Sequence, residues 1–145
     1  MSGATCPCGS GRLLEACCGL FHGGTPAPDA EALMRSRYSA YVLGLEAYLQ
    51  ATWHPDTRPA TLGLDATPRS HWLGLAIKSH TMLDANHATV EFVARYKLNG
   101  RAFKLHEVSR FERVDGRCAQ TAHSASVWQR TPCGCWLYVD GEIRE

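Results

Sequence analysis

The order of patterns along this 145-residue chain predicts an α+β protein in which an antiparallel sheet wraps around helices. Two segments with helical periodicity come first, and strand-like alternation around a strong hairpin signal follows. A cluster of four cysteines precedes both. The length supports one compact body that buries about two-thirds of its unfolded surface.

The cysteine cluster is the most informative stretch of the sequence. Its members are spaced as C-x-C, eight residues, then C-C, at Cys6, Cys8, Cys17 and Cys18. Thiolates at such spacing can complete the tetrahedron that structural zinc requires. A disulfide is an alternative, although adjacent Cys17 and Cys18 would bridge each other only with strain, and four free thiols are another. We expect one structural zinc ion, with no open position for water.

The same stretch, Cys-Pro-Cys-Gly-Ser-Gly followed by Cys-Cys-Gly, resembles the SEC-C motif, which is named after the zinc-binding tail of the translocase ATPase SecA. The resemblance implies that the four cysteines are the zinc ligands and that the motif touches a partner. We assign residues 1–24 to this zinc knuckle. Its exposed side, with Arg12, Leu13 and Leu14, is expected to dock a protein or ribonucleoprotein partner.

Composition places the chain among ordinary globular proteins. Apolar residues make up 45% of the chain, charged residues 20%, and the net charge is +1, so no global basic field attracts nucleic acid or an anionic membrane. The first residues lack the pattern of a secretory leader, and no apolar run approaches the length of a membrane span. We expect a cytoplasmic protein, either a monomer or a weak dimer, without membrane association.

Helical signals follow a link rich in Gly and Pro at residues 20–28. Asp29 offers an N-cap side chain, and Gly44 is placed to end the helix. Between and beyond them runs one apolar stripe, formed by Met34, Tyr38, Tyr41, Val42 and Leu45. A second short helix is expected at residues 46–53, and residues 55–70 are expected to be mostly loop.

Strand signals begin near residue 72. Residues 72–83 are irregular, whereas residues 88–98 alternate cleanly and end at Asn99-Gly100, the strongest short hairpin signal. A two-residue turn there determines the strand register. The predicted facing pairs are Leu98 with Arg101, Tyr96 with Phe103, Ala94 with Leu105, Phe92 with Glu107, Val90 with Ser109 and Ala88 with Phe111.

The C-terminal part contains a hairpin signal, Asp115-Gly116, whose matching return strand at residues 136–139 comes late. We interpret residues 118–135 as an insertion at a hairpin tip. The insertion repeats the C-x-C spacing, so a second zinc is possible, with the ligands Cys118, His123, Cys133 and Cys135. The alternative is a loop with free thiols.

Beyond the knuckle, the chain is similar to the YchJ-like proteins, an uncharacterised bacterial group. The matching stretches are Leu33-Met34-Arg35-Ser36-Arg37-Tyr38, Thr52-Trp53-His54-Pro55, Phe92-Val93-Ala94-Arg95-Tyr96, Glu107-Val108-Ser109-Arg110-Phe111 and Trp136-Leu137-Tyr138-Val139-Asp140-Gly141. The resemblance implies a nuclear-transport-factor-2-like (NTF2-like) domain at residues 25–145, a curved antiparallel sheet closed by helices into a cone, as in cystatin-like folds. Such domains include enzymes and simple binding proteins, so the fold alone does not decide function.

Glu107 is the polar residue of greatest interest in the body, because the predicted register places it on an apolar face. One hypothesis makes it a general acid or base in a cone pocket, paired with His54 or Asp140. The alternative is a structural ion pair with Arg35 or Arg37. The predicted pocket residues are Arg35, Arg37, Tyr38, Trp53, Glu107 and Ser109.

Asp140 has two interpretations. If the hairpin register survives the insertion, Tyr138 opposes Phe111, and Asp140 opposes Ser109 and points inward; otherwise Asp140-Gly141 forms a turn, which we favour. On the outer face, a modest basic strip contains His106 and Arg110, with Arg95, Lys97 and Lys104.

The leading interpretation is therefore a non-enzymatic zinc protein that binds a partner. The first alternative is a small pocket enzyme (hydrolase, dehydratase or isomerase), and the second is nucleic-acid binding through the knuckle and the basic strip.

Overall fold

The computed structural model describes residues 5–23, 27–60, 71–114, 118–119, 128–129 and 135–144. Helical elements come first: η1 (Leu14–Ala16), α1 (Cys18–His22), α2 (Ala30–Leu43) and α3 (Glu46–Ala51). Strands follow: β1 (His71–Asp84), β2 (His87–Leu98), β3 (Arg101–Val114), β4 (Cys118–Ala119), β5 (Trp128–Gln129) and β6 (Cys135–Ile143). Among the described residues, no helix is long and apolar enough to cross a membrane.

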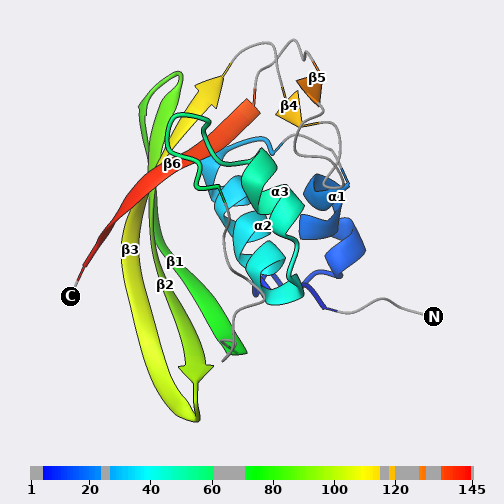
Figure 1. The fold of residues 1–145 in the computed structure, drawn as a ribbon, viewed down its shortest axis with the longest axis vertical. Coiled ribbons are helices and arrows are strands. Elements are labelled where there is room, and N and C mark those ends of the chain that lie inside the picture. Colours follow the sequence, from blue (N-terminus) through cyan, green and yellow to red (C-terminus); the bar gives the residue numbers. More distant parts are fainter. Residues whose placement is uncertain are drawn as a thin grey trace.

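The main sheet is antiparallel and has the strand order β1-β2-β3-β6. It curves around the helices, which lie on one side of it, with α2 nearest the strands (Figure 1). Strands β4 and β5 form a separate two-stranded pair. This arrangement confirms the predicted α+β class and the predicted curved antiparallel sheet.

The β2–β3 hairpin confirms the predicted register at all six predicted pairs, from Leu98 with Arg101 to Ala88 with Phe111. Asn99 and Gly100 have φ angles of 52° and 78°, as a two-residue turn with positive φ at both positions requires. Because side chains alternate across a strand, this register also determines which side chains face the helices.

Strand β1 is irregular for a physical reason. Its pairing with β2 shifts register between Trp72 and Gly74, between Ile77 and Ser79, and between Met82 and Asp84. Each shift moves later side chains to the other face, which hides the alternation in the sequence. Bulges also bend and twist a strand, so they contribute to the curvature of the sheet around α2.

Helix α2 begins and ends where the sequence predicts. The Asp29 side chain accepts a hydrogen bond of 2.7 Å from the Ala32 amide, and Gly44 adopts a left-handed conformation at φ 75°. Two other boundaries differ from expectation. Helix α3 ends at Ala51, two residues before the predicted end, and residues 20–22, predicted to belong to a link, form the end of helix α1.

Strand β6 returns beside β3 and explains how the insertion joins the sheet. Val114 pairs with Cys135. Phe111 pairs with Tyr138, and this second pair was predicted. The register shifts between Arg110 and Phe111, so that Asp140 faces Arg110 rather than Ser109. The strand continues to Ile143, so Asp140-Gly141 is not a turn. Both interpretations of Asp140 were therefore wrong.

The knuckle and the body share one core. The same cluster of buried side chains contains Cys6, Cys8, Cys17 and Cys18 and also members from α2 and the sheet, among them Leu33, Val90 and Phe111. The N-terminal segment is thus packed into the fold rather than appended to it.

Candidate metal centre and cavity

The four N-terminal cysteines form a compact and closed cluster. Their Sγ atoms all lie within 4.8 Å of one another, and the residues are only 0–3% exposed. Cys17 Sγ lies 3.7 Å from Cys8 Sγ and 4.0 Å from Cys18 Sγ. In a tetrahedron of thiolates about 2.3 Å from a metal, sulfur atoms are about 3.8 Å apart. The donor set and its spacing therefore fit a metal ion.

Local backbone conformation brings these thiols together. Gly9 and Gly11, on either side of Ser10, have φ angles of 84° and 85°, which L-residues with side chains rarely adopt. A Cβ on Gly19 would lie 2.6 Å from the Leu14 carbonyl oxygen, so this position also requires glycine. The glycines that follow each cysteine pair are thus part of the site's construction.

Hydrogen bonds connect the thiols of the cluster to one another and to neighbouring side chains. Ser10 Oγ and Arg12 Nη2 lie 3.2 Å and 3.8 Å from Cys17 Sγ. A hydrogen bond from Cys18 lowers the pKa of Cys8 to about 4, and the same contact raises the pKa of Cys18, with burial adding to the rise. Four thiolates this close repel one another, so all four lose their protons together only when a cation joins them.

Helix α2 holds the cluster against the body. Arg35 Nη1 donates to the Cys8 carbonyl at 3.0 Å, and Ser39 Oγ lies 3.5 Å from Cys6 Sγ. His22, on α1, hydrogen-bonds the Ser36 carbonyl through Nε2 at 2.8 Å. We call this side of α2, with Arg35, Ser36 and Ser39, its closed face.

The predicted docking residues differ in accessibility. Arg12 is exposed, whereas Leu13 and Leu14 are half-buried. Leu14 packs against the main core, and the backbone of Leu13 forms an isolated bridge with Thr5. Leu20 is 48% exposed and was missed, because residues 20–22 were predicted to be part of a link.

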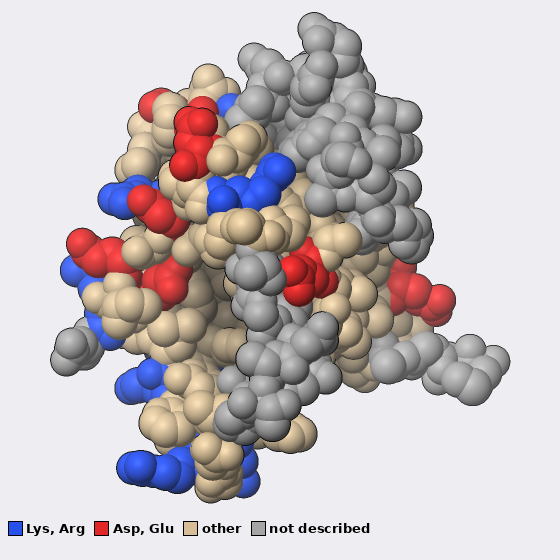
Figure 2. Space-filling view, viewed as in Figure 1, with Lys and Arg blue, Asp and Glu red and all other residues tan. Residues whose placement is uncertain are grey.

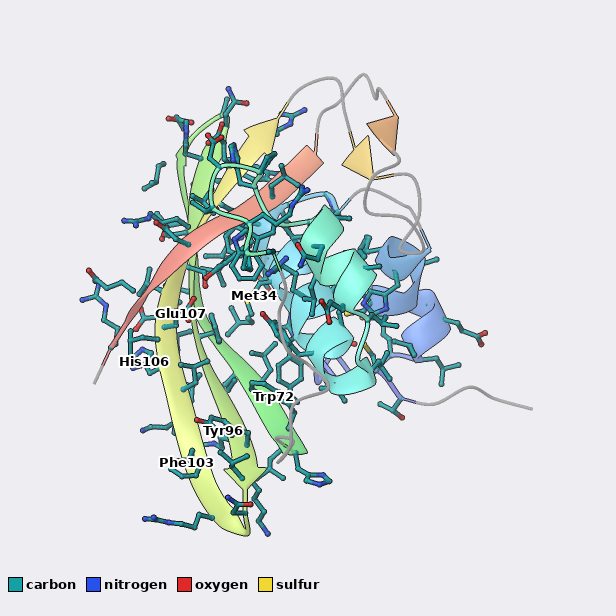
Figure 3. All side chains as sticks on the ribbon, viewed as in Figure 1. Met34, Trp72, Tyr96, Phe103, His106 and Glu107 are labelled. Atoms are coloured by element: carbon teal, nitrogen blue, oxygen red, sulfur yellow. The ribbon has the colours of Figure 1, made fainter. Side chains whose placement is uncertain are left out.

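A cavity of about 250 Å³ lies on the other side of α2, between the helix and the concave side of the sheet. Met34, Trp72 and Glu107 surround this space, with His106 on the outer side of the sheet (Figure 3). The lining residues come from α2 and from every strand of the main sheet: Met34, Arg37, Tyr38, Tyr41, Trp72, Phe92, Ala94, Leu105, Glu107, Ser109 and Tyr138. We call the side of α2 that lines this space its cavity face.

Four of the predicted pocket residues line this cavity: Arg37, Tyr38, Glu107 and Ser109. Two do not. Arg35 lies on the closed face, where it pairs with Glu31 at 3.2 Å. Trp53 packs edge-on against Tyr138 at 4.9 Å between ring centroids and is not part of the lining.

The Glu107 carboxylate is held by the sheet. Its Oε2 accepts hydrogen bonds from Ser109 Oγ at 2.6 Å and from Tyr138 Oη at 3.3 Å. A Cβ on Gly141 would lie 1.9 Å from Oε2, so the carboxylate occupies space that only glycine leaves open. The carboxylate forms no ion pair with Arg35 or Arg37 among the described contacts, so the predicted structural ion pair is wrong.

Arg37 is a buried cation on the cavity face, only 3% exposed. Its Nη1 donates to the Leu49 carbonyl at 2.9 Å and to Thr52 Oγ1 at 2.7 Å. The guanidinium lies 4.9 Å and 4.6 Å from the ring centroids of Trp53 and Tyr138, within the range of cation–π attraction. Burial lowers the pKa of Arg37, an effect that the nearby tyrosines and Glu107 partly offset.

The proposed acid–base partners of Glu107 lie elsewhere. His54 is not part of the cavity lining; its Nδ1 accepts from the Asp56 amide and its Nε2 lies 3.7 Å from Glu112 Oε1. Asp140 forms a two-point ion pair with Arg110 on the outer face, at 2.5 and 2.6 Å. The pairing of Glu107 with His54 or Asp140 was therefore wrong, because the shift near Arg110 turns Asp140 outward.

Two of the five basic residues of the outer strip are paired with acids. His106 Nε2 lies 2.7 Å from Glu91 Oε2, and Arg110 pairs with Asp140. In the view of Figure 2, basic and acidic side chains are intermixed, except at the lower end, where basic groups gather near the end of the β2–β3 hairpin. Away from that end, the face in this view offers little continuous positive surface for a phosphate backbone.

The predicted second zinc site lies outside the part of the chain whose side chains the structure describes. The backbones of Cys118 and Cys135 belong to β4 and β6, while His123 and Cys133 fall outside the described residues. The second site stays a prediction.

Seven residues of the cavity lining were absent from the predicted pocket, Tyr138 among them, and so was Gly141, which leaves room for the Glu107 carboxylate. The signal for Tyr138 was present, because its predicted partner Phe111 is on the inner face. Gly141 was interpreted as a turn residue, and only the position of the Glu107 carboxylate explains why glycine is needed there.

Comparison with known proteins agrees with this architecture. The model of the YchJ middle domain, described as NTF2-like, matches residues 29–141, and the SEC-C motif model matches residues 4–20. Fold and cysteine cluster together define the class: an NTF2-like domain preceded by a SEC-C motif.

The relatives identify the family. A UPF0225 protein of Ralstonia nicotianae is 54% identical over an alignment of 143 positions, which covers 97% of this chain and 92% of the relative. Another, of Chromobacterium violaceum, is 56% identical over an alignment of 146 positions, which covers 97% of this chain and 93% of the relative. The chain belongs to the YchJ-like UPF0225 family.

Two solved structures are similar over their whole folds. The solution structure of a SEC-C motif containing protein from Rhodopseudomonas palustris matches with a TM-score of 0.72 at 29% identity, covering 100% of both chains. The crystal structure of a SEC-C motif containing protein from Psychrobacter arcticus matches with a TM-score of 0.71 at 28% identity, covering 98% of this chain and 84% of that one.

Proposed function

We propose that this protein carries one structural zinc ion on Cys6, Cys8, Cys17 and Cys18, and that the ion fastens the N-terminal segment to the body. The observation that carries the proposal is the complete set of four buried thiols within 4.8 Å. Four thiolates fill a tetrahedral zinc site, so no position remains for a catalytic water. Bound zinc would supply positive charge that keeps all four sulfurs ionised.

The place of the cluster in the core supports a structural role. Its thiols belong to the same buried cluster as α2 and the sheet, and α2 contacts it through Arg35 and Ser39. Because a metal that binds only the folded chain adds its binding free energy to stability, zinc would stabilise the whole fold.

Elemental analysis tests this proposal on protein purified without added metal. We expect one zinc per chain, lost in Cys17→Ser and kept in the matched control Cys133→Ser, which removes a cysteine from the insertion. A second zinc lost with Cys133→Ser would show that the insertion also binds metal. Protein that contains no zinc, yet folds, would overturn the proposal.

We further propose that the knuckle's exposed edge docks a protein partner. Arg12 and Leu20 support this role, because both are accessible and flank the buried cysteines. A protein is favoured over nucleic acid, since acidic Glu15 is exposed in the same segment as Arg12 and two basic residues of the outer strip pair with Glu91 and Asp140.

Site-specific photo-crosslinking in cells tests the docking edge. A photoreactive residue at Leu20 is expected to capture one defined protein, and the same residue at exposed Lys104, on the outer sheet face, is expected not to. A cross-link that Arg12→Glu leaves unchanged, or a cross-link to RNA, would contradict the proposal.

A further inference from the structure

The cavity on the other side of α2 has features that the zinc centre does not explain. Apolar and aromatic side chains form most of its wall, including Trp72, Phe92 and Leu105. Two charged groups, Arg37 and Glu107, also line it. A cavity of about 250 Å³ is small, below the range typical of sites for drug-sized ligands. It suits a ligand of roughly ten non-hydrogen atoms.

Arg37 has unused hydrogen-bonding capacity. The described hydrogen bonds use only Nη1 of its three nitrogens, toward Leu49 and Thr52. No described residue accepts a hydrogen bond from Nε or Nη2. A guanidinium that is 97% buried is costly to leave partly unpaired, and its uncommitted N–H groups belong to a residue of the cavity wall.

Glu107 has one oxygen fixed and one available. Ser109 and Tyr138 both donate to Oε2, and no described residue donates to Oε1. These two hydrogen bonds therefore hold the carboxylate in position before any ligand binds, and Oε1 stays free as an acceptor. Such preorganisation is typical of binding sites, because a ligand then does not have to order the site.

The two charges lie in one cavity without touching. Arg37 feels the field of Glu107, yet the pair forms no ion pair among the described contacts. Together the two charges make the cavity neutral. Arg37 offers hydrogen-bond donors and Glu107 offers an acceptor. A ligand with a net charge would leave one charge unbalanced in an apolar enclosure, which is unfavourable.

We propose that the cavity binds a small neutral molecule with an aromatic or aliphatic body and an amide-like head group. The head group presents an acceptor to the free N–H groups of Arg37 and a donor to Oε1 of Glu107, as a primary carboxamide does. The body packs against Trp72, Phe92 and Leu105. This site is separate from the metal centre and does not depend on the proposed zinc or docking roles.

Four probes of nearly equal shape test the head group: benzamide, benzoate, benzylamine and toluene. Each is titrated into the full-length protein, and binding is followed by NMR chemical-shift changes of the Trp72 indole and the Ala94 methyl. Benzamide has about nine non-hydrogen atoms, so we expect a dissociation constant in the millimolar range or below. We expect benzamide to bind at least about fivefold more tightly than each of the other three.

Glu107→Gln sharpens the test, because it changes charge with little change in shape. The variant cavity carries a net positive charge from Arg37, so we expect benzoate to gain about tenfold and benzamide to lose about fivefold. In Gly141→Ala, the new methyl displaces the carboxylate, and benzamide should weaken without a gain for toluene. Asp140→Asn, next to Gly141 but on the outer face, is the control and should bind as wild type does.

The outcomes separate this proposal from the zinc proposal. Zinc content and the far-ultraviolet circular dichroism spectrum are measured on every variant, so a folding defect is recognised directly. The ligand proposal is overturned if benzamide does not bind at millimolar concentrations, if a charged probe or toluene binds best, or if Glu107→Gln leaves the preference unchanged.

Discussion

The two faces of helix α2 differ in how completely their polar groups are satisfied. On the closed face, Ser36 Oγ donates to the Leu33 carbonyl and also contacts Tyr48 Oη at 2.7 Å, and Arg35 reaches the Cys8 carbonyl. On the cavity face, Arg37 keeps unused donors beside open volume. Helix α2 thus combines a closed face that stabilises the fold with a cavity face that keeps free hydrogen-bonding groups for binding.

Metal removal should have the largest effect on stability, because the cysteines beside the closed face would lose the ion that joins them. Structural zinc contributes about 10–16 kcal/mol of binding free energy in small zinc domains, while whole proteins are stable by only about 5–15 kcal/mol. We therefore expect a strong chelator to abolish cooperative thermal unfolding, as followed by circular dichroism. Added Zn²⁺ should restore the transition and added Mg²⁺ should not. An unchanged transition in metal-free protein would contradict the closed-face account.

The substitution Leu33→Ala should cause the second-largest loss of stability. Leu33 is 2% exposed and belongs to the core that contains the cysteines, so its truncation leaves a cavity and should cost about 3 kcal/mol of unfolding free energy. The control Leu43→Ala lies on the same helix at 45% exposure and should cost less than about 0.5 kcal/mol. Urea denaturation measures both, and equal losses would contradict the prediction.

A pair of tyrosine variants compares the two faces directly. Tyr48→Phe removes a buried hydroxyl that contacts Ser36 Oγ and should cost about 1–2 kcal/mol. Tyr41→Phe removes a hydroxyl from the cavity wall, where no described residue bonds it, and should change stability by less than about 0.5 kcal/mol. Denaturant unfolding of both variants measures the difference. A larger loss for Tyr41→Phe would reverse the assignment of the two faces.

The smallest effect should be a pH dependence at His22. Burial lowers the pKa of His22, and its hydrogen bond with the Ser36 carbonyl only partly opposes this shift. The unfolded chain, with a His pKa near about 6.5, then takes up a proton at a higher pH than the folded chain. The unfolding free energy therefore has its full value above about pH 7. It decreases as the pH drops through the pKa of His22 in the folded chain.

Unfolding free energies measured from pH 7.5 to 5 (roughly the range in which His titrates) test this prediction. The loss should be steeper in wild type than in His22→Asn. The contribution of the cysteine ligands is common to both proteins and cancels in the difference. Parallel curves would show that His22 is not responsible.

Sequence reasoning succeeded where local rules decide the structure. Asn99-Gly100 requires a tight turn, and the period of two then places every later residue of the hairpin, including Glu107 on the inner face. Asp29 and Gly44 bound α2 because a cap oxygen and a left-handed residue are needed at its ends. The four cysteines are close enough in sequence for spacing alone to indicate a cluster.

Sequence reasoning failed where a single residue or a distant contact determines the structure. One register shift beside Arg110 turns Asp140 from the inner to the outer face, and no sequence period reveals such a shift. Arg35 and Arg37 are two positions apart, about 200° around a helix, so they lie on opposite faces of α2; helical periodicity alone could have separated them. The free N–H groups of Arg37 follow from Leu49 and Thr52 meeting Nη1 alone, which only the tertiary structure shows.

The pairing of Val114 with Cys135 has an evolutionary consequence. Facing residues of antiparallel strands lie only about 5 Å apart, so the segment between them leaves the sheet and returns to it almost at one point. The entropy of closing a loop grows slowly with length. Residues 115–134 can therefore become longer, shorter or different in evolution while the metal centre and the cavity stay unchanged. A junction of this kind admits new sequence while the scaffold on either side stays the same.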